Sequence, residues 1–160
     1  MFRKTWKFFT IMLVALSMSM AFCHLLEMPV RLDYSPELWS RVTNVENTYR
    51  YFGSRFGAFL EVGAVVTAIG LVVLSRTETR SIMFWTLIAA GCMGTAQVIW
   101  WAFVFPVNQQ MIEWTPENLP ADFVELRSQW EYTHAARAVL QMVSLAAVVI
   151  SVLSTSPQAQ

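Results

Sequence analysis

The sequence predicts an all-α integral membrane protein in which four membrane-spanning helices form a bundle. Apolar residues make up 56% of the 160 residues and charged residues 14%, whereas about a quarter of the residues of a soluble domain are charged. Four apolar runs lie at about 7–28, 54–74, 81–105 and 132–153. Each is long enough to cross a bilayer, which takes roughly 20 helical residues. We therefore expect residues 1–160 to form one transmembrane domain.

The first run follows a basic N-terminus, an arrangement that is also typical of a secretory signal peptide. Ser19-Met-Ala21 has the small residues of a cleavage site. The apolar run nevertheless continues past that site to Met28, which is longer than the apolar region of a signal peptide. We therefore expect this segment to be retained as the first helix.

The distribution of basic residues predicts the orientation in the membrane. Arg3, Lys4 and Lys7 crowd the N-terminus, and Arg76 and Arg80 lie in the short link between the second and third runs. On the opposite side, basic residues are spread over two long loops and mixed with acidic ones. Because positive charge in short flanks marks the cytoplasmic side, we expect both termini in the cytoplasm and the protein in a bacterial inner (cytoplasmic) membrane.

The charge balance narrows the classes of partner. The formal net charge is zero, so the chain lacks the basic footprint of a nucleic-acid-binding protein. The expected partners are the lipid bilayer and a hydrophobic small molecule that enters from it.

Both long loops carry a helix-start signal, which is a hydroxyl residue followed by proline and glutamate, at 35–37 and 115–117. After the first signal, apolar residues follow at helical spacing, at Leu38, Trp39, Val42, Val45 and Tyr49. We expect short amphipathic helices in both outer loops, which either cover the mouth of the bundle or lie on the membrane surface. From Ala121 a helical pattern runs into the fourth span.

The chain has two histidines, His24 and His134, and both are expected at the same depth in the membrane. His24 lies near the end of the first run and His134 near the start of the fourth. Each has an ionisable residue one helical turn away, Glu27 and Arg137. Ionisable side chains in a bilayer are costly and usually face a bundle interior or a water-filled cavity. This cluster is therefore predicted to be the functional site.

Helical spacing brings further polar residues to the same side. On the fourth run, polar and aromatic residues follow at intervals of three and four and share a face, namely Arg127, Trp130, His134, Arg137 and Gln141. The third run adds Gln97 and Asn108, and the second adds Glu61 about two turns inside its outer end. All four helices are thus expected to direct a polar side chain into one pocket in the outer half of the membrane.

Three interpretations of this pocket are open, and the first is a metal or haem site. His24, Glu27, Glu61 and His134 supply two imidazoles and two carboxylates, ligands that suit one transition metal. The two histidines on neighbouring helices could also ligate haem from both sides. The chain would then be a non-catalytic metal- or haem-binding membrane subunit.

The second interpretation is catalysis without a cofactor, and the third is a structural scaffold. A desolvated histidine beside Glu27 is a candidate general base, and Arg137 and Asn108 could stabilise an oxyanion. The substrate would be hydrophobic, with an acidic C–H or a phenolic group. In a scaffold, Glu27 or Glu61 would instead pair with Arg137 and hold the helices in register.

Several motifs resemble one membrane family. Phe105-Pro-Val-Asn108, then Leu126-Arg-Ser-Gln-Trp130 and His134-Ala-Ala-Arg137, resemble the four-helix membrane family that includes the fungal anthrone oxygenases. Cys23-His-Leu-Leu-Glu-Met-Pro29 resembles a bacterial branch of it.

This resemblance implies four helices and an oxygenase-type activity on polyketide anthrones that needs no cofactor. Asn108, Trp130, His134 and Arg137 match the general pattern, whereas His24 and Glu27 match only the branch. The leading prediction is therefore a small oxygenase-like oxidoreductase of the membrane, with His24 and His134 as bases or ligands and Glu27 orienting or ligating.

Overall fold

The computed structural model describes residues 1–44 and 56–154. In these two stretches the chain is helical and has no β-strand, apart from an isolated bridge between Thr115 and Asn118. The elements in order are α1 (Phe2–Leu32), α2 (Pro36–Thr43), α4 (Ala58–Leu74), α5 (Arg80–Ile99), a π-helical turn (Trp100–Val104), α6 (Phe105–Met111) and α7 (Phe123–Leu153). The predicted all-α class is confirmed.

Three helical segments in the described part of the chain are long and apolar enough to cross a membrane. They are Phe2–Leu32, Arg80–Met111 and Phe123–Leu153. The helix α4 is also apolar but has 17 residues, fewer than a typical span. The helices α1 and α7 begin earlier than the predicted runs at 7–28 and 132–153. The first two residues of the run at 54–74 lie outside the described residues.

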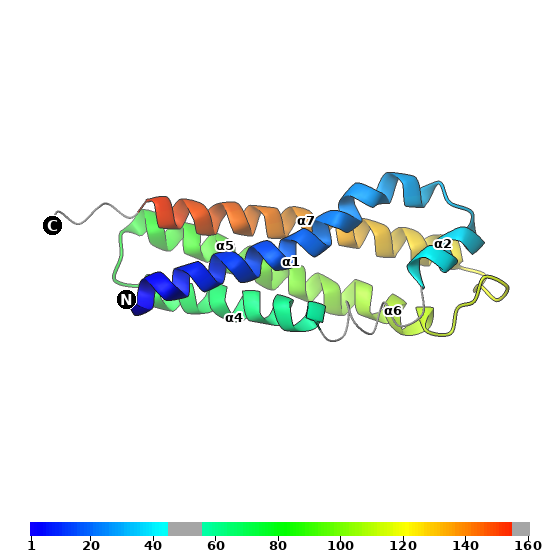
Figure 1. Ribbon diagram of the computed structural model, residues 1–160, viewed down its shortest axis with the longest axis horizontal. Helices are drawn as coiled ribbons and strands as arrows, with labels where there is room; N and C mark the ends of the chain where they lie inside the picture. The colour runs from blue at the N-terminus through cyan, green and yellow to red at the C-terminus, as the bar shows by residue number, and fades with distance from the viewer. Residues whose placement is uncertain (45–55, 155–160) are drawn as a thin grey trace.

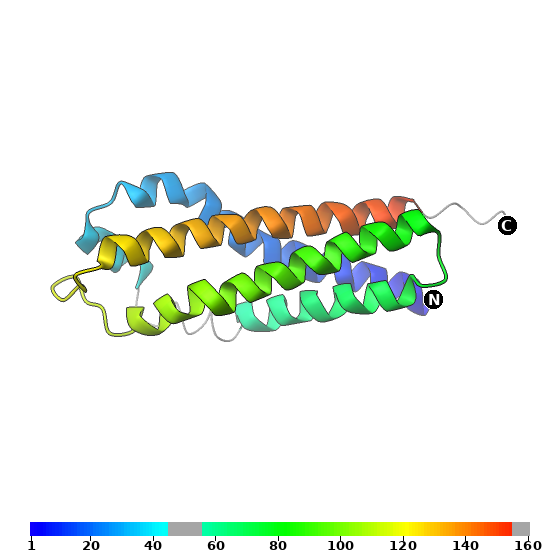
Figure 2. The ribbon, with the colours of Figure 1, turned by 180° about the vertical axis from the view of Figure 1, so that it is seen from behind.

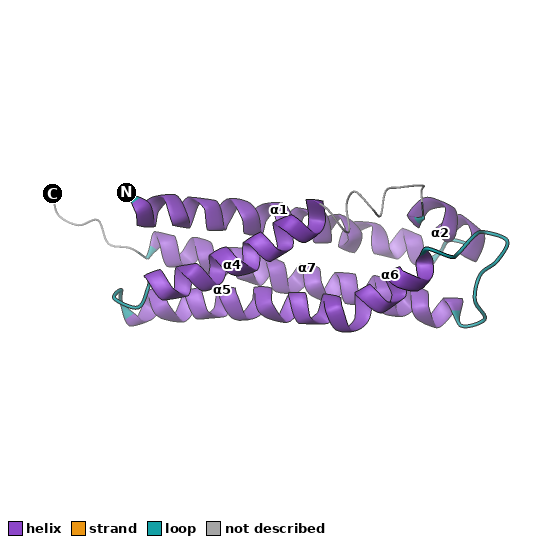
Figure 3. Cartoon of the chain, turned by 90° about the horizontal axis from the view of Figure 1, so that it is seen from below, coloured by secondary structure: helices purple, strands orange, loops and turns teal. Residues whose placement is uncertain are grey.

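The four longer helices α1, α4, α5 and α7 run lengthwise alongside one another (Figure 1). The helix α7 packs against α1 and α5, and α4 packs against the same two helices from the other side. The start of α1, the α4–α5 link and the end of α7 lie at one end, as the view from behind also shows (Figure 2). The short helices α2 and α6 lie at the opposite end (Figure 3).

Small residues let the helices approach closely in the half of the molecule near the N-terminus. Buried side chains of α1, α4, α5 and α7 form two adjoining clusters there, made of Val14, Ala64, Ala68 and Met93, and of Leu71, Ala89, Ala147 and Val148. The hydroxyl of Ser144 donates to the backbone carbonyl of Ala89 at 2.9 Å and joins α7 to α5. Small side chains and interhelical hydrogen bonds of this kind are typical of helix packing in membranes.

At Gly70, α1 approaches α4 so closely that no room is left for a side chain. A Cβ at this position would overlap the indole ring of Trp6, whose Nε1 donates to the carbonyl of Thr67 at 3.0 Å. We expect Gly70→Ala to lower the free energy of unfolding by about 1–3 kcal/mol, because the indole must move away from its partner. Equilibrium unfolding in detergent micelles measures this loss. Gly91→Ala is the matched control, since a Cβ there meets nothing within 4 Å, and equal losses in both variants would contradict the explanation.

The helix α5 passes through a π-helical turn before Pro106. The N–H of Phe105 bonds to the carbonyl of Trp100, five residues earlier, and Pro106 itself has no N–H to donate. The side-chain amide of Gln129 on α7 donates to the carbonyl of Phe103 at 2.9 Å. Such π turns are frequent at functional sites, and this one carries two tryptophans to the cavity described below.

The outer-loop predictions were partly right. The helix α2 begins as the 35–37 signal predicts, with the Ser35 hydroxyl accepting from the Leu38 N–H at 3.3 Å. Its Trp39 is fully buried, so α2 packs against the helix ends. Val45 and Tyr49 of the predicted stripe lie outside the described residues.

The second predicted loop helix is wrong, because 115–117 forms a turn and the next helix begins at Phe123. A helix starting at Pro116 would meet Pro120 within its first two turns, and proline disfavours helical conformation in the residue before it.

Candidate functional site

A cavity of about 620 Å³ lies between the helices at the end that carries α2 and α6. All of α1, α2, α4, α5, α6 and α7 contribute to its wall, and most lining side chains are apolar or aromatic. The polar side chains that reach it are His24, Arg31, Thr43, Glu61, Gln97, Asn108, Gln109, His134 and Arg137. A mainly apolar cavity with a few converging polar groups is the usual form of a small-molecule site.

The two histidines meet in the wall of this cavity. The ring centroids of His24 and His134 are 4.4 Å apart and the ring planes are tilted by 33°. The indole of Trp130 contacts both rings, with its centroid 5.1 Å from His24 and 4.3 Å from His134. His24 Nδ1 and His134 Nε2 are buried and have no hydrogen-bond partner among the described residues. Each ring therefore has one buried nitrogen that no described residue satisfies.

Arg137 connects His134 to two other helices. Its side chain is 2% exposed, and its Nη2 donates to the carboxylate of Glu61 on α4. Its Nη1 lies 3.3 Å from His134 Nδ1, and its Nε donates to the carbonyl of Ala96 on α5 at 3.2 Å. Glu61 thus pairs with Arg137. The interpretation of the pocket as a structural scaffold predicts this contact for either Glu27 or Glu61.

Asn108 lines the cavity from α6 and is held by a tryptophan of α7. The indole Nε1 of Trp130 donates to Asn108 Oδ1 at 2.8 Å, and Asn108 is buried. Because this bond uses the amide oxygen, the two N–H groups of the amide remain for other partners.

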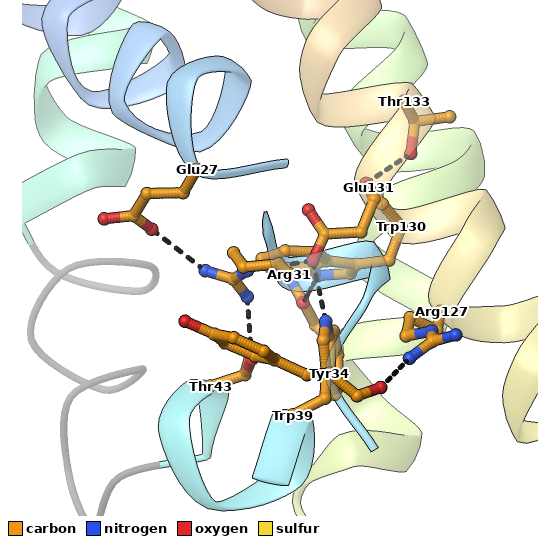
Figure 4. A network of polar contacts seen from close by, with 10 residues as sticks. Glu27, Arg31, Tyr34, Trp39, Thr43, Arg127, Trp130, Glu131 and Thr133 are labelled. Atoms are coloured by element: carbon orange, nitrogen blue, oxygen red, sulfur yellow. Dashed lines mark hydrogen bonds and ion pairs between the residues drawn. The ribbon is translucent and has the colours of Figure 1, made fainter. Parts of the chain in front are cut away.

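A second polar cluster lies next to the cavity, and sequence reasoning missed it (Figure 4). Arg31 at the end of α1 donates through Nε to Glu131 on α7 at 2.9 Å, and through Nη2 to the Thr43 hydroxyl on α2 at 2.7 Å. Trp39 Nε1 donates to the same carboxylate oxygen at 2.7 Å. The guanidinium also lies over the ring of Trp130, 5.0 Å from its centroid. The hydrogen bonds and the ion pair of this cluster join α2 to α1 and α7.

Glu27 does not lie where the site prediction placed it. Its side chain is 61% exposed and its carboxylate pairs with Arg31 at 3.2 Å. It is not among the residues that line the cavity. The predicted role of Glu27 as the partner of His24 therefore has no support in the geometry, because helical spacing of four favours Arg31 as its partner.

The predicted metal ligands do not converge. Within residues 1–44 and 56–154 no three histidine, cysteine or acidic side chains come together in a way that could hold a metal ion. Glu27 and Glu61 are each paired with an arginine. Two imidazoles on opposite sides of one metal, each bonded at about 2 Å, have ring centres roughly 6 Å apart, and the histidine rings lie closer than that. The donor set therefore fits neither the four-ligand site nor bis-histidine haem.

Comparisons with protein-family models, with curated proteins and with solved structures found no match for this chain. The resemblance to the anthrone oxygenase family therefore stays a prediction from motifs. Because a helical fold hosts many activities, function has to be argued from the cavity and the side chains that line it.

Proposed function

We propose that the chain is a four-helix inner-membrane protein whose cavity binds a hydrophobic small molecule and oxidises it in the manner of an oxygenase. The observation that carries this proposal is the pair of contacting imidazoles, His24 and His134, in the wall of a largely apolar cavity. The motif resemblance to the anthrone oxygenases supports the same reaction class.

The exposed side chains of α4 support a fourth span. Along this helix, large apolar side chains at intervals of three and four are about half exposed or more, namely Phe59, Val62, Val66, Ile69 and Val73. In water such a stripe would be unfavourable, whereas lipid tails would cover it. At about 1.5 Å per residue, α4 is slightly shorter than the hydrocarbon layer, and a local thinning of the bilayer can accommodate that difference.

The proposed orientation has both termini in the cytoplasm. The start of α1 and the end of α7 lie at the same end of the molecule (Figure 1), as four antiparallel spans require. Arg3 at that end bonds to Glu78 and Thr77 in the short α4–α5 link. The basic residues of these two segments favour the cytoplasmic side, so the cavity would open toward the outer half of the membrane.

The chemistry proposed for the site starts with proton removal by His24. Its Nδ1 has no protein partner among the described residues, and its ring lines the cavity in which an acidic C–H or a phenol of the substrate would lie. The negative charge that develops on a substrate oxygen would be stabilised by the Asn108 amide and the Arg137 guanidinium in the same cavity. Molecular oxygen would be the oxidant, as the resemblance implies.

Turnover of anthrone by the purified protein in lipid nanodiscs tests this proposal. We expect oxygen-dependent conversion of anthrone to anthraquinone, and His24→Ala should lower the rate by about 10²–10⁴-fold, the usual contribution of a general base. Thr86→Ser is the matched control, because Thr86 is buried on α5 but does not line the cavity. No conversion by the wild-type protein, with anthrone and oxygen in excess, would remove the oxygenase proposal.

A structural scaffold is the second candidate, because two buried ion pairs tie α7 to α1 and to α4. The two candidates differ in what the double variant His24→Ala/His134→Ala should do. A scaffold should lose stability, whereas a catalyst should lose turnover and keep its midpoint of unfolding.

A further inference from the structure

The contact between Arg137 and His134 determines which ring nitrogen carries the proton. A guanidinium has only donors, so His134 Nδ1, which lies 3.3 Å from Arg137 Nη1, must accept. A neutral imidazole that accepts at Nδ1 carries its proton on Nε2. His134 is therefore an N–H donor at Nε2, and its acceptor lone pair is already used.

Glu61 holds the Arg137 guanidinium in the position from which it can donate to His134 Nδ1. Arg137 donates to Glu61 on one side and to the Ala96 carbonyl on another, so three contacts from three helices fix its plane. Without the carboxylate, the buried guanidinium would be left with an unpaired charge. Glu61 is thus a positioning residue that acts on His134 through Arg137.

The Nε2–H of His134 is buried and has no partner among the residues that the structure describes. The histidine is 7% exposed and its ring lines the cavity. A buried donor without an acceptor is unfavourable, and the cavity that this ring lines is the place from which a ligand could supply the acceptor. Asn108 adds amide N–H groups to the same wall, since its oxygen is taken by Trp130. The carboxylate of Glu61, the acidic side chain in this wall, is occupied by Arg137.

We propose that the Glu61–Arg137–His134 relay presents His134 as a hydrogen-bond donor to the cavity, and that the cavity takes its ligand through an acceptor oxygen, either a carbonyl or a phenolate. His24 is then the single base of the imidazole pair. This assignment rests on the proposed function in one respect, which is that the cavity is the ligand site. It also explains why His134 is unsuited to ligate a metal, which would need an unprotonated nitrogen.

Nitrogen-15 NMR of the histidine rings tests the relay directly. The chain has two histidines, so the spectrum contains signals from four ring nitrogens. The variant His24→Phe removes the two signals of His24 and thereby assigns the other two to His134. We expect His134 of the wild-type protein to be a single neutral species protonated at Nε2. In the variant Glu61→Leu/Arg137→Leu, which removes both charges together, both tautomers should be populated. Protonation of wild-type His134 at Nδ1, or at both nitrogens, would overturn the relay, and the wild-type measurement needs no variant to fold.

A matched pair of probes tests the ligand class. Fluorenone and fluorene differ by one carbonyl oxygen on the same flat skeleton. We expect fluorenone to bind about two- to tenfold more tightly, the value of one hydrogen bond, and to shift the His134 Nε2 proton signal. His134→Phe should abolish the preference. Equal affinity of both probes for the wild-type protein would overturn the acceptor-oxygen assignment. Neither measurement needs turnover, so a failure to oxidise anthrone is a separate result.

Discussion

Replacing Arg31 with methionine is expected to lower the free energy of unfolding by about 3–5 kcal/mol. Arg31 and Glu131 are paired at 2.9 Å with side chains 7% and 0% exposed. Methionine fills most of the space but leaves the Glu131 carboxylate buried, with the Trp39 N–H as a remaining donor. Equilibrium unfolding in mixed detergent micelles, followed by circular dichroism, measures the loss.

An exposed ion pair that involves the neighbouring short helix α2 supplies the control. Arg41 lies 4.0 Å from Glu117, with side chains 69% and 76% exposed, and Arg41→Met should change the stability by less than about 1 kcal/mol. The double variant Arg31→Met/Glu131→Met should lose less than Arg31→Met alone, because no charge is left unpaired. Similar losses for Arg31→Met and Arg41→Met would show that the buried pair does not carry the stability of this end.

The meeting of His24 and His134 could be predicted because both lie at the same level of antiparallel helices and polar side chains turn toward the interior of a bundle. Two antiparallel helices place residues at equal distances from one membrane face side by side, and helical rise fixes those distances. The inward direction of Arg137 follows equally well, since it shares a helical face with His134. Periodicity thus gives the residues that line the wall.

The helical periodicity of the sequence does not show which ion-pair partner each charged side chain takes. Arg31 lies beyond Met28, where the first apolar run ends, and α1 continues through Pro29 to Leu32. Its partner Glu131 is 100 residues away, so the pairing depends on how α1 and α7 pack. Glu27 has His24 three residues before it and Arg31 four residues after it, and its carboxylate pairs with Arg31.

The four side chains predicted as metal ligands do not come together for the same reason. Two arginines pair with the carboxylates of Glu27 and Glu61, and a list of ligand types does not show which partner a carboxylate takes. The direction of the Arg137 guanidinium is set by tertiary packing, because its contacts come from three helices. The direction in turn sets which nitrogen of His134 donates, so neither could be read from the sequence.

Replacing Arg137 with methionine is the second change expected to have a large effect, a loss of about 3–5 kcal/mol in the free energy of unfolding. Arg137 is 2% exposed and serves three partners, Glu61, Ala96 and His134. Its removal leaves the Glu61 carboxylate without its cation inside the helix packing. The matched control is Arg3→Met, which breaks the Arg3–Glu78 pair at the other end, where the side chains are 52% and 27% exposed, and should cost less than about 1 kcal/mol.

A double-mutant cycle with Glu61→Gln separates charge from hydrogen bonding at this site. The glutamine amide oxygen can still accept from Arg137, so Glu61→Gln should cost less than Arg137→Met, and the two losses should not add because the residues are in contact. We expect the double variant to be more stable than the sum of the single losses predicts, by about 0.5–3 kcal/mol. Additive losses would mean that Arg137 acts mainly through Ala96 and His134. In that case α4 would be held by its apolar contacts, and the Glu61 carboxylate would be free to serve the cavity directly.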